Sequence, residues 1–229
     1  MLWENNERGD TMLRAIDVAK LFIKRGLDTF CNTHDGNMKI QKLLFFANLI
    51  SLSEKGVPLF SDDVSAFTNG CVVEDVRLRY KNAYNDLHKD SMQFNPDFTQ
   101  DEYEVINLTE KLFGDLSARE LSTINHSFKF WEVAFNRSVL ENGFKIKELS
   151  TITIDEMMVE VPKIKAVIDE FRANLACGKS KEIVNGVAFY YSPDMKMTDE
   201  IYEQLELFSK EADDNSYSIY LDEGELVIY

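Results

Sequence analysis

The hydrophobic positions of the chain form their clearest pattern in residues 37–56. On a helical wheel this stretch carries two apolar arcs on roughly opposite sides, formed by Ile40, Leu43, Leu44, Phe46, Ala47 and Ile50 and by Met38, Phe45, Leu49 and Leu52. Large apolar residues are mostly interior, so the pattern predicts a central helix with neighbours on both sides. Gly56 can supply a left-handed stop, and Pro58 prevents the helix from resuming.

Polar seams separate the two apolar arcs. Gln41 and Asn48 lie in one seam, and Lys39, Lys42 and Ser53 lie in the other. Core packing explains the arcs but not the polar side chains between them.

The same kind of pattern predicts the elements around this helix. They are a one-sided outer helix over 12–25, a polar loop over 27–36, an extended segment or short strand that closes in a turn at Asn69-Gly70, and a helix over 72–84.

Three capping boxes mark later helix starts, at Thr99–Glu102, Ser117–Glu120 and Thr153–Glu156. In each box the hydroxyl and the carboxylate satisfy backbone amides at the start of a helix. The boxes predict a helix at about 100–113, a helix that ends near His126, and a short helix before Pro162.

The C-terminal part changes character. A further helix is expected from Pro162 to near Gly178, then a hairpin over 181–191 turning at Asn-Gly, a helix over 198–212, and a second hairpin over 217–229. We therefore predict a mainly α fold: a compact helical domain over 1–155 and, over 156–229, a helix with a small α+β extension packed on the first domain. The extension could serve partner specificity or clamp the core.

Composition limits the function classes. The chain has 229 residues, with 25 Lys and Arg against 40 Asp and Glu, and a formal net charge of −15. This charge repels nucleic acids and anionic membranes, although it permits a basic protein partner. Three widely spaced cysteines fit neither a disulfide framework nor a thiolate metal site. With no apolar leader and no spanning run, we expect a soluble, cytoplasmic protein.

Catalytic chemistry has little support in the sequence. The three histidines (His34, His88 and His126) lie far apart, and no metal-binding or phosphate-loop motif occurs. We expect no enzyme activity, no cofactor and no metal. The alternative from a different class is a small metal-independent hydrolase using Cys31 or His126.

An ordered series of motifs resembles the Panacea domain, a family that includes SocA-like and GepA-like phage-associated proteins. The series consists of Asn37–Ala47, Pro58-Leu-Phe, Ala66–Gly70 with Val72–Val76, Leu116-Ser with Glu120-Leu121, His126 and Trp131, within about residues 12–155. The family often has an aromatic-then-Gly-Pro turn where this chain has Phe67-Thr68-Asn69-Gly70-Cys71, and a tryptophan is common at the position of Phe67.

The resemblance implies an antitoxin of a toxin–antitoxin system that neutralises a cognate protein toxin by direct binding. The alternatives within the interaction class are an adaptor that delivers a toxin to a AAA+ protease and an ordinary regulatory scaffold; a homo-oligomer is compatible with any of them. The partner-binding candidates are Lys39, Gln41, Lys42, Phe67, Asn69, Gly70, His126 and Trp131. If Lys39 and Lys42 are exposed, charge reversal should abolish binding with little change in stability. The competing interpretation places these lysines inside, paired with carboxylates, and Trp131 in the core.

Overall fold

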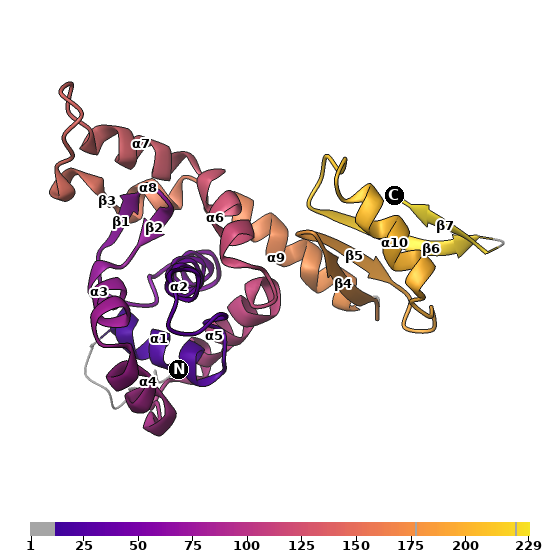
Figure 1. Cartoon of the computed structure of the whole chain (residues 1–229), viewed down its shortest axis with the longest axis horizontal. Coiled ribbons are helices and arrows are strands. Elements are labelled where there is room, and N and C mark those ends of the chain that lie inside the picture. Colours follow the sequence, from indigo (N-terminus) through magenta and orange to yellow (C-terminus); the bar gives the residue numbers. More distant parts are fainter. Residues whose placement is uncertain (1–11, 177, 223) are drawn as a thin grey trace, which may run out of the picture. The chain divides into compact units, whose positions relative to one another are not determined.

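The computed structural model describes residues 12–176, 178–222 and 224–229 (Figure 1). Contacts divide the chain into a helical unit that ends at Ile164 and a C-terminal unit that starts at Lys165. The sequence interpretation placed the boundary at residue 155, whereas the contacts group residues up to Ile164 with the helical unit. The predicted fold class, mainly α with a small C-terminal α+β part, is confirmed.

The helical unit contains nearly all of the helices. Its elements among the described residues are α1 (Ala15–Lys24), α2 (His34–Lys55), β1 (Val64–Phe67), β2 (Gly70–Val72), α3 (Glu74–Asn82), α4 (Tyr84–Gln93), α5 (Gln100–Phe113), α6 (Ala118–His126), α7 (Lys129–Ser138), the 3-10 turn η1 (Lys147–Ser150), β3 (Thr151–Ile152), α8 (Ile154–Met158) and the start of α9 (Val161–Ala176).

Helix α2 is the buried centre of this unit, as the two apolar arcs predicted. Every residue from Lys39 to Leu52 is buried, and α1, α3, α5 and α6 all pack on the helix. Phe45 and Phe46 join an aromatic cluster with residues of α5 and α7. The helix ends at Lys55, where Gly56 adopts a left-handed φ of 74°.

The start of α2 corrects one sequence prediction. The polar loop was expected to run to residue 36, but the helix begins at His34. The Thr33 hydroxyl accepts a hydrogen bond from the Gly36 amide and caps the first turn. This cap brings His34 and Asn37 onto the N-terminal end of the central helix.

All three capping boxes are confirmed. Thr99, Ser117 and Thr153 each accept a hydrogen bond from the amide three residues later, and the glutamates at those positions bond back to the cap amides. Helix α5 occupies the residues that the first box predicted.

A small sheet lies against the helices of this unit. Its strand order is β2-β1-β3, and all pairs are antiparallel. The predicted turn at Asn69-Gly70 is present, since Phe67 pairs with Gly70 across a two-residue connection. The pairing of β1 with the short β3 was not predicted.

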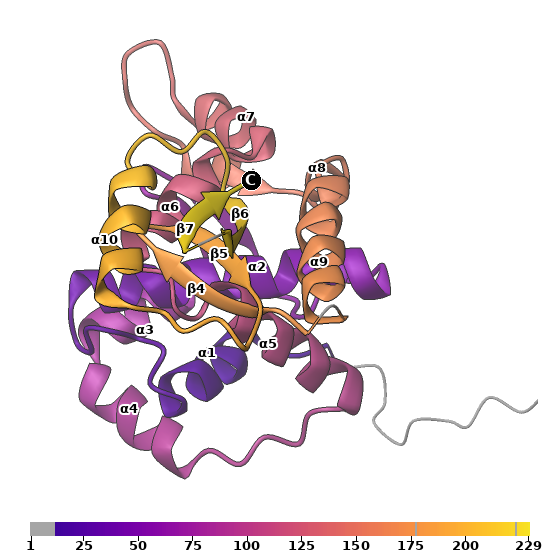
Figure 2. The ribbon, with the colours of Figure 1, turned by 90° about the vertical axis from the view of Figure 1, so that its right-hand side faces the viewer.

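The C-terminal unit is an α+β module. After α9 it contains β4 (Ser180–Val184), β5 (Val187–Tyr191), α10 (Asp199–Phe208), β6 (Ser216–Asp222) and β7 (Glu225–Ile228). Both predicted hairpins form, and a parallel β5–β6 pair joins them into one sheet. Helix α10 packs Ile201 and Leu205 into the apolar core of this sheet (Figure 2). Cys177, one of the three cysteines, lies outside the described residues.

Candidate functional site: a cationic pocket and the adjoining turn

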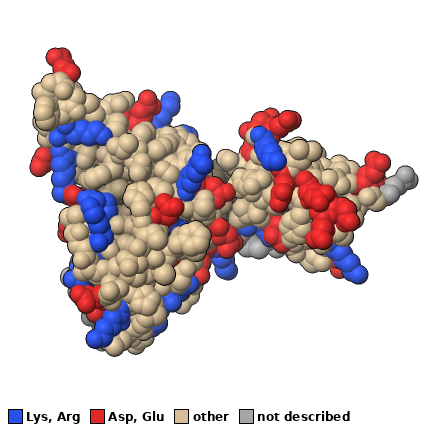
Figure 3. Space-filling model, viewed as in Figure 1, with Lys and Arg blue, Asp and Glu red and all other residues tan. Residues whose placement is uncertain are grey.

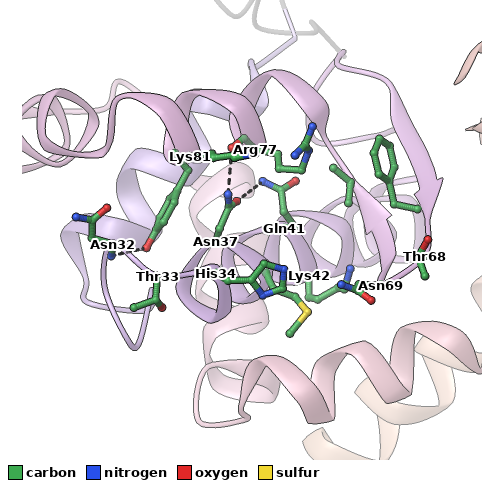
Figure 4. A pocket seen from close by; sticks show the side chains of 14 residues that line it. Asn32, Thr33, His34, Asn37, Gln41, Lys42, Thr68, Asn69, Arg77 and Lys81 are labelled. Atoms are coloured by element: carbon green, nitrogen blue, oxygen red, sulfur yellow. Dashed lines mark hydrogen bonds between the residues drawn. The ribbon is translucent and has the colours of Figure 1, made fainter.

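A pocket of about 430 Å³ opens beside the N-terminal half of α2. Figure 4 shows that its side chains come from the loop before α2, the N-terminal half of α2, helix α3, and the β1–β2 hairpin with its turn. We call it the α2 pocket. Its lining residues are Asn32, Thr33, His34, Asn37, Met38, Gln41, Lys42, Phe67, Thr68, Asn69, Val72, Arg77, Tyr80 and Lys81.

Lys42 is the most deeply placed charged residue of the α2 pocket. It is 1% exposed, and its ammonium donates a 3.0 Å hydrogen bond to the carbonyl oxygen of Cys71. Burial lowers the pKa of Lys42 to about 8, and the neighbouring Cys71 thiol acts weakly in the opposite direction. The amine is therefore largely protonated at neutral pH although it is buried.

A chain of amides fixes the wall next to Lys42. The backbone amide of Val73 donates to Gln41 Oε1 at 2.8 Å, Gln41 Nε2 donates to Asn37 Oδ1 at 3.4 Å, and Asn37 Nδ2 donates to the carbonyl oxygen of Arg77 at 3.0 Å (Figure 4). A side-chain amide nitrogen carries two N–H groups. Among the described residues, each of these two nitrogens uses one N–H, so one donor on each stays available.

Gly70 allows the turn to approach Lys42 closely. Its φ is +95°, and an added Cβ would overlap Asn125 Oδ1 and lie 2.8 Å from Lys42 Nζ. The same Asn125 oxygen accepts a 2.6 Å hydrogen bond from the Cys71 amide. A side chain at position 70 would therefore displace both groups.

An aromatic stack lies on the other side of the same turn. Trp131 Nε1 donates to the carbonyl oxygen of Phe67 at 2.9 Å, and the Trp131 ring lies 4.1 Å from the His126 ring and 5.1 Å from the Phe135 ring. His126 is exposed and Trp131 is half-buried. Burial and the Lys42 charge lower the pKa of His126, whereas a hydrogen bond with the Thr68 backbone raises it.

Seven of the eight predicted partner-binding residues gather around the β1–β2 turn. Gln41, Lys42, Phe67 and Asn69 line the α2 pocket, while Gly70, His126 and Trp131 contact the turn or its neighbours. We call the exposed part of this region, Thr68, Asn69 and His126 with the half-buried Trp131, the turn surface.

Lys39 lies apart from this group. It is 5% exposed, and burial lowers its pKa while the charges of Asp115, Glu120 and Asp28 act to raise it. The expectation that Lys39 and Lys42 could be charge-reversed as exposed residues is therefore wrong, because both are buried where α6 and β2 pack on α2. The competing interpretation is correct that both lysines are buried. Within the described residues Lys39 feels the charges of Asp115, Glu120 and Asp28 without a direct ion pair, and Lys42 has a carbonyl oxygen as its hydrogen-bond acceptor.

The sequence analysis missed most of the α2 pocket. His34, Asn37, Arg77 and Lys81 line it but were not candidates. Asn37 belonged to the Panacea-like motif and could have been found by that signal. Arg77 and Lys81 are four residues apart on α3, a spacing that puts two cations on one helix face.

The alternative catalytic residues are not joined into a catalytic pair. Cys31 is exposed, while burial raises the pKa of the buried Cys71 thiol to about 12. Over the part of the chain that the structure describes, no cysteine or serine is hydrogen-bonded to a histidine side chain, and no group of three metal-ligating side chains is present. Nor does any described helix have the length and apolarity needed to span a bilayer.

These features define a helical domain built on one buried helix, with a cationic pocket and an aromatic turn at one end. Residues 40–132 match the family model described as Antitoxin SocA-like, Panacea domain. The predicted resemblance is thereby confirmed for this stretch, which includes α2 from Ile40 onward, the β1–β2 turn and the His126–Trp131 pair. Searches among curated proteins and among solved structures found no match.

Proposed function

We propose that the chain is an antitoxin that neutralises a cognate protein toxin by direct contact, without catalysis of its own. The match of residues 40–132 to the antitoxin-like Panacea domain carries this proposal, since it supports an antitoxin role and a protein partner. The mechanism is steric: the folded domain covers the surface through which the toxin acts.

The turn surface is the proposed contact. Interface anchors are commonly aromatic groups beside mixed polar groups, and Trp131 with His126 and Asn69 has this composition. Hydrogen bonds from Trp131 and Ser122 to the turn backbone hold the turn in place before a partner arrives. A preformed turn loses little conformational freedom on binding.

The test is a co-expression rescue assay with any adjoining gene whose product is toxic when expressed alone. Asn69→Arg and His126→Glu place bulk and charge on the turn surface, and we expect the double variant to lose rescue. Both residues are exposed, so the variant should keep its fold.

Helix α4 offers a matched control. Asn85→Arg and His88→Glu make the same chemical changes at exposed residues, and His88 also lies beside an aromatic ring, that of Tyr84. Helix α4 lies at the opposite end of the helical unit from β1 and β2 (Figure 1). The control should rescue fully; equal loss in both variants, or none in either, would refute the contact.

The toxin level in the same cells separates neutralisation from delivery to a protease. Direct neutralisation predicts that the toxin persists in a complex that co-purifies with the chain. Rescue accompanied by loss of toxin protein would favour the adaptor function instead.

A further inference from the structure

The α2 pocket differs in charge from the rest of the chain. The chain has 40 acidic residues, and the C-terminal unit alone carries 14 of them against 6 basic ones. Figure 3 shows acidic side chains crowded on the visible face of that unit and mixed charges over the helical unit. Yet the described residues that line the α2 pocket include Lys42, Arg77 and Lys81 and no Asp or Glu.

The cations of the pocket are incompletely neutralised. Lys42 donates to a carbonyl oxygen rather than a carboxylate, and Lys81 makes no ion pair within the described part of the chain. Arg77 does pair with Glu74, at 3.2 Å, and its guanidinium lies 5.5 Å from the centre of the Phe67 ring. Buried charges are normally paired with an opposite charge. An anion bound in the pocket would supply that charge for the Lys42 ammonium.

The remaining wall supplies donors and an apolar face. The available N–H groups of Asn37 and Gln41 suit oxygen acceptors, while Met38, Phe67 and Val72 offer apolar surface. A volume of about 430 Å³ falls in the range of small-molecule sites, which combine apolar walls with a few polar groups. It is too small for a folded segment of a partner.

We propose that the α2 pocket binds a small organic anion, with its phosphate or carboxylate group beside Lys42 and its apolar body against Phe67. The charged group would accept hydrogen bonds from the Lys42 ammonium and from the amides of Asn37 and Gln41. Lys81 and Arg77 would contribute long-range attraction from α3. This site shares Thr68 and Asn69 with the turn surface, but its binding of an anion does not require a toxin.

The experiment is an NMR titration of the purified full chain with three probes. Phenyl phosphate carries both a ring and an anion, phenol carries the ring alone, and inorganic phosphate carries the anion alone. The Met38 methyl signal reports the pocket, and the buried Met157 methyl on α8 is the internal control. Phenyl phosphate should shift the Met38 methyl signal, and the shift should saturate at a few mM. We expect its binding to be about tenfold tighter than that of phenol or inorganic phosphate.

Three variants test whether phenyl phosphate binds in the α2 pocket or is only attracted by positive charges elsewhere on the chain. Lys42→Met should weaken the binding of phenyl phosphate at least about tenfold and leave the binding of phenol unchanged. Lys39→Met removes a buried lysine outside the pocket and should have no effect on binding. Arg77→Gln is a second pocket variant, available if Lys42→Met fails to fold, and should weaken phenyl phosphate by severalfold.

Two results would overturn the proposal. One is the absence of any Met38 shift with phenyl phosphate at up to about 10 mM, a concentration that would detect even weak binding. The other is equal weakening by Lys39→Met and Lys42→Met. Because no toxin is present in the titration, either failure leaves the rescue assay to judge the antitoxin function separately.

Discussion

Lys39 and Lys42 lie in the same polar seam of α2, but their charges have different surroundings. Both lysines are buried, at 5% and 1% exposure, and burial lowers both pKa values. Lys39 lies within the field of Asp115, Glu120 and Asp28, so the fold itself supplies part of the counter-charge, although burial outweighs it. Lys42 has a carbonyl oxygen as its acceptor and lines a pocket without carboxylates.

This difference in surroundings assigns different roles to the two lysines. A buried charge with nearby counter-charges is destabilising mainly when one partner is removed, whereas an unbalanced buried charge is itself a cost to folding. We infer that Lys39 belongs to the architecture of the helical unit. Lys42 lines a pocket without an Asp or Glu among its described residues, so we assign it to binding.

The largest effect on stability is expected at Gly70, in the turn that approaches Lys42 closely. Gly70→Ala should lower the free energy of unfolding by about 3 kcal/mol or more, because the new methyl group would collide with Asn125 and because φ is +95°. Gly26→Ala is the matched control: its φ is +75° but no atom lies within 4 Å, so only the backbone strain of about 1–2 kcal/mol applies. Equal losses in urea unfolding would contradict the close approach of the turn to Lys42.

The next effect compares the two lysines directly. Lys42→Met should raise the free energy of unfolding by about 1–2 kcal/mol at pH 7, because removing the buried charge outweighs the loss of one hydrogen bond. Lys39→Met should raise it by less, since the charges of Asp115, Glu120 and Asp28 offset part of the cost of burying Lys39. Thermal and urea unfolding of both variants measure this; equal gains would remove the distinction.

The gain in free energy of unfolding that Lys42→Met gives at pH 7 should vanish at high pH. The pKa of Lys42 is about 8 in the folded chain against an ordinary value of 10.5, so between these values the unfolded chain binds more protons. The contribution of Lys42 to stability therefore rises with pH across this window. The nearby Cys71 thiol, with its pKa raised to about 12, acts in the opposite direction but is common to both proteins. A stability difference that stays constant from pH 7 to 10.5 would disprove the shift.

The smallest stability effect is expected on the turn surface. The double variant Asn69→Arg and His126→Glu should change the free energy of unfolding by less than about 0.5 kcal/mol, because both side chains are exposed. Chemical unfolding beside the α4 control, Asn85→Arg and His88→Glu, checks this. A loss well above that of the control would mean that any failure of rescue reflects unfolding.

Local signals predicted the elements of the fold well. The capping boxes at Thr99, Ser117 and Thr153 set three helix starts, and the Asn185-Gly186 pair set a hairpin, because each depends on hydrogen bonds within a few residues. The start of α2 was misplaced since its Thr33 cap is followed at the third position by Gly36, which lacks the carboxylate of a capping box.

The site was predicted less well, because it depends on contacts between distant segments. The helical wheel placed Lys39 and Lys42 correctly between the apolar arcs, but a wheel cannot show that α6 and β2 cover them. Likewise, nothing local indicates that Arg77 and Lys81 of α3 face the first turns of α2 across a pocket. The family motif brought most of the turn residues together correctly, since it reflects three-dimensional proximity.

The most direct test of this account is the pKa of the Lys42 amine, measured by NMR on the side-chain signals of the full chain with and without phenyl phosphate. The account predicts a value of about 8 in the free protein, and a clear rise when the anion is bound beside the amine. A pKa near 10.5 that phenyl phosphate leaves unchanged would contradict the inference that Lys42 is a buried charge that binds an anion.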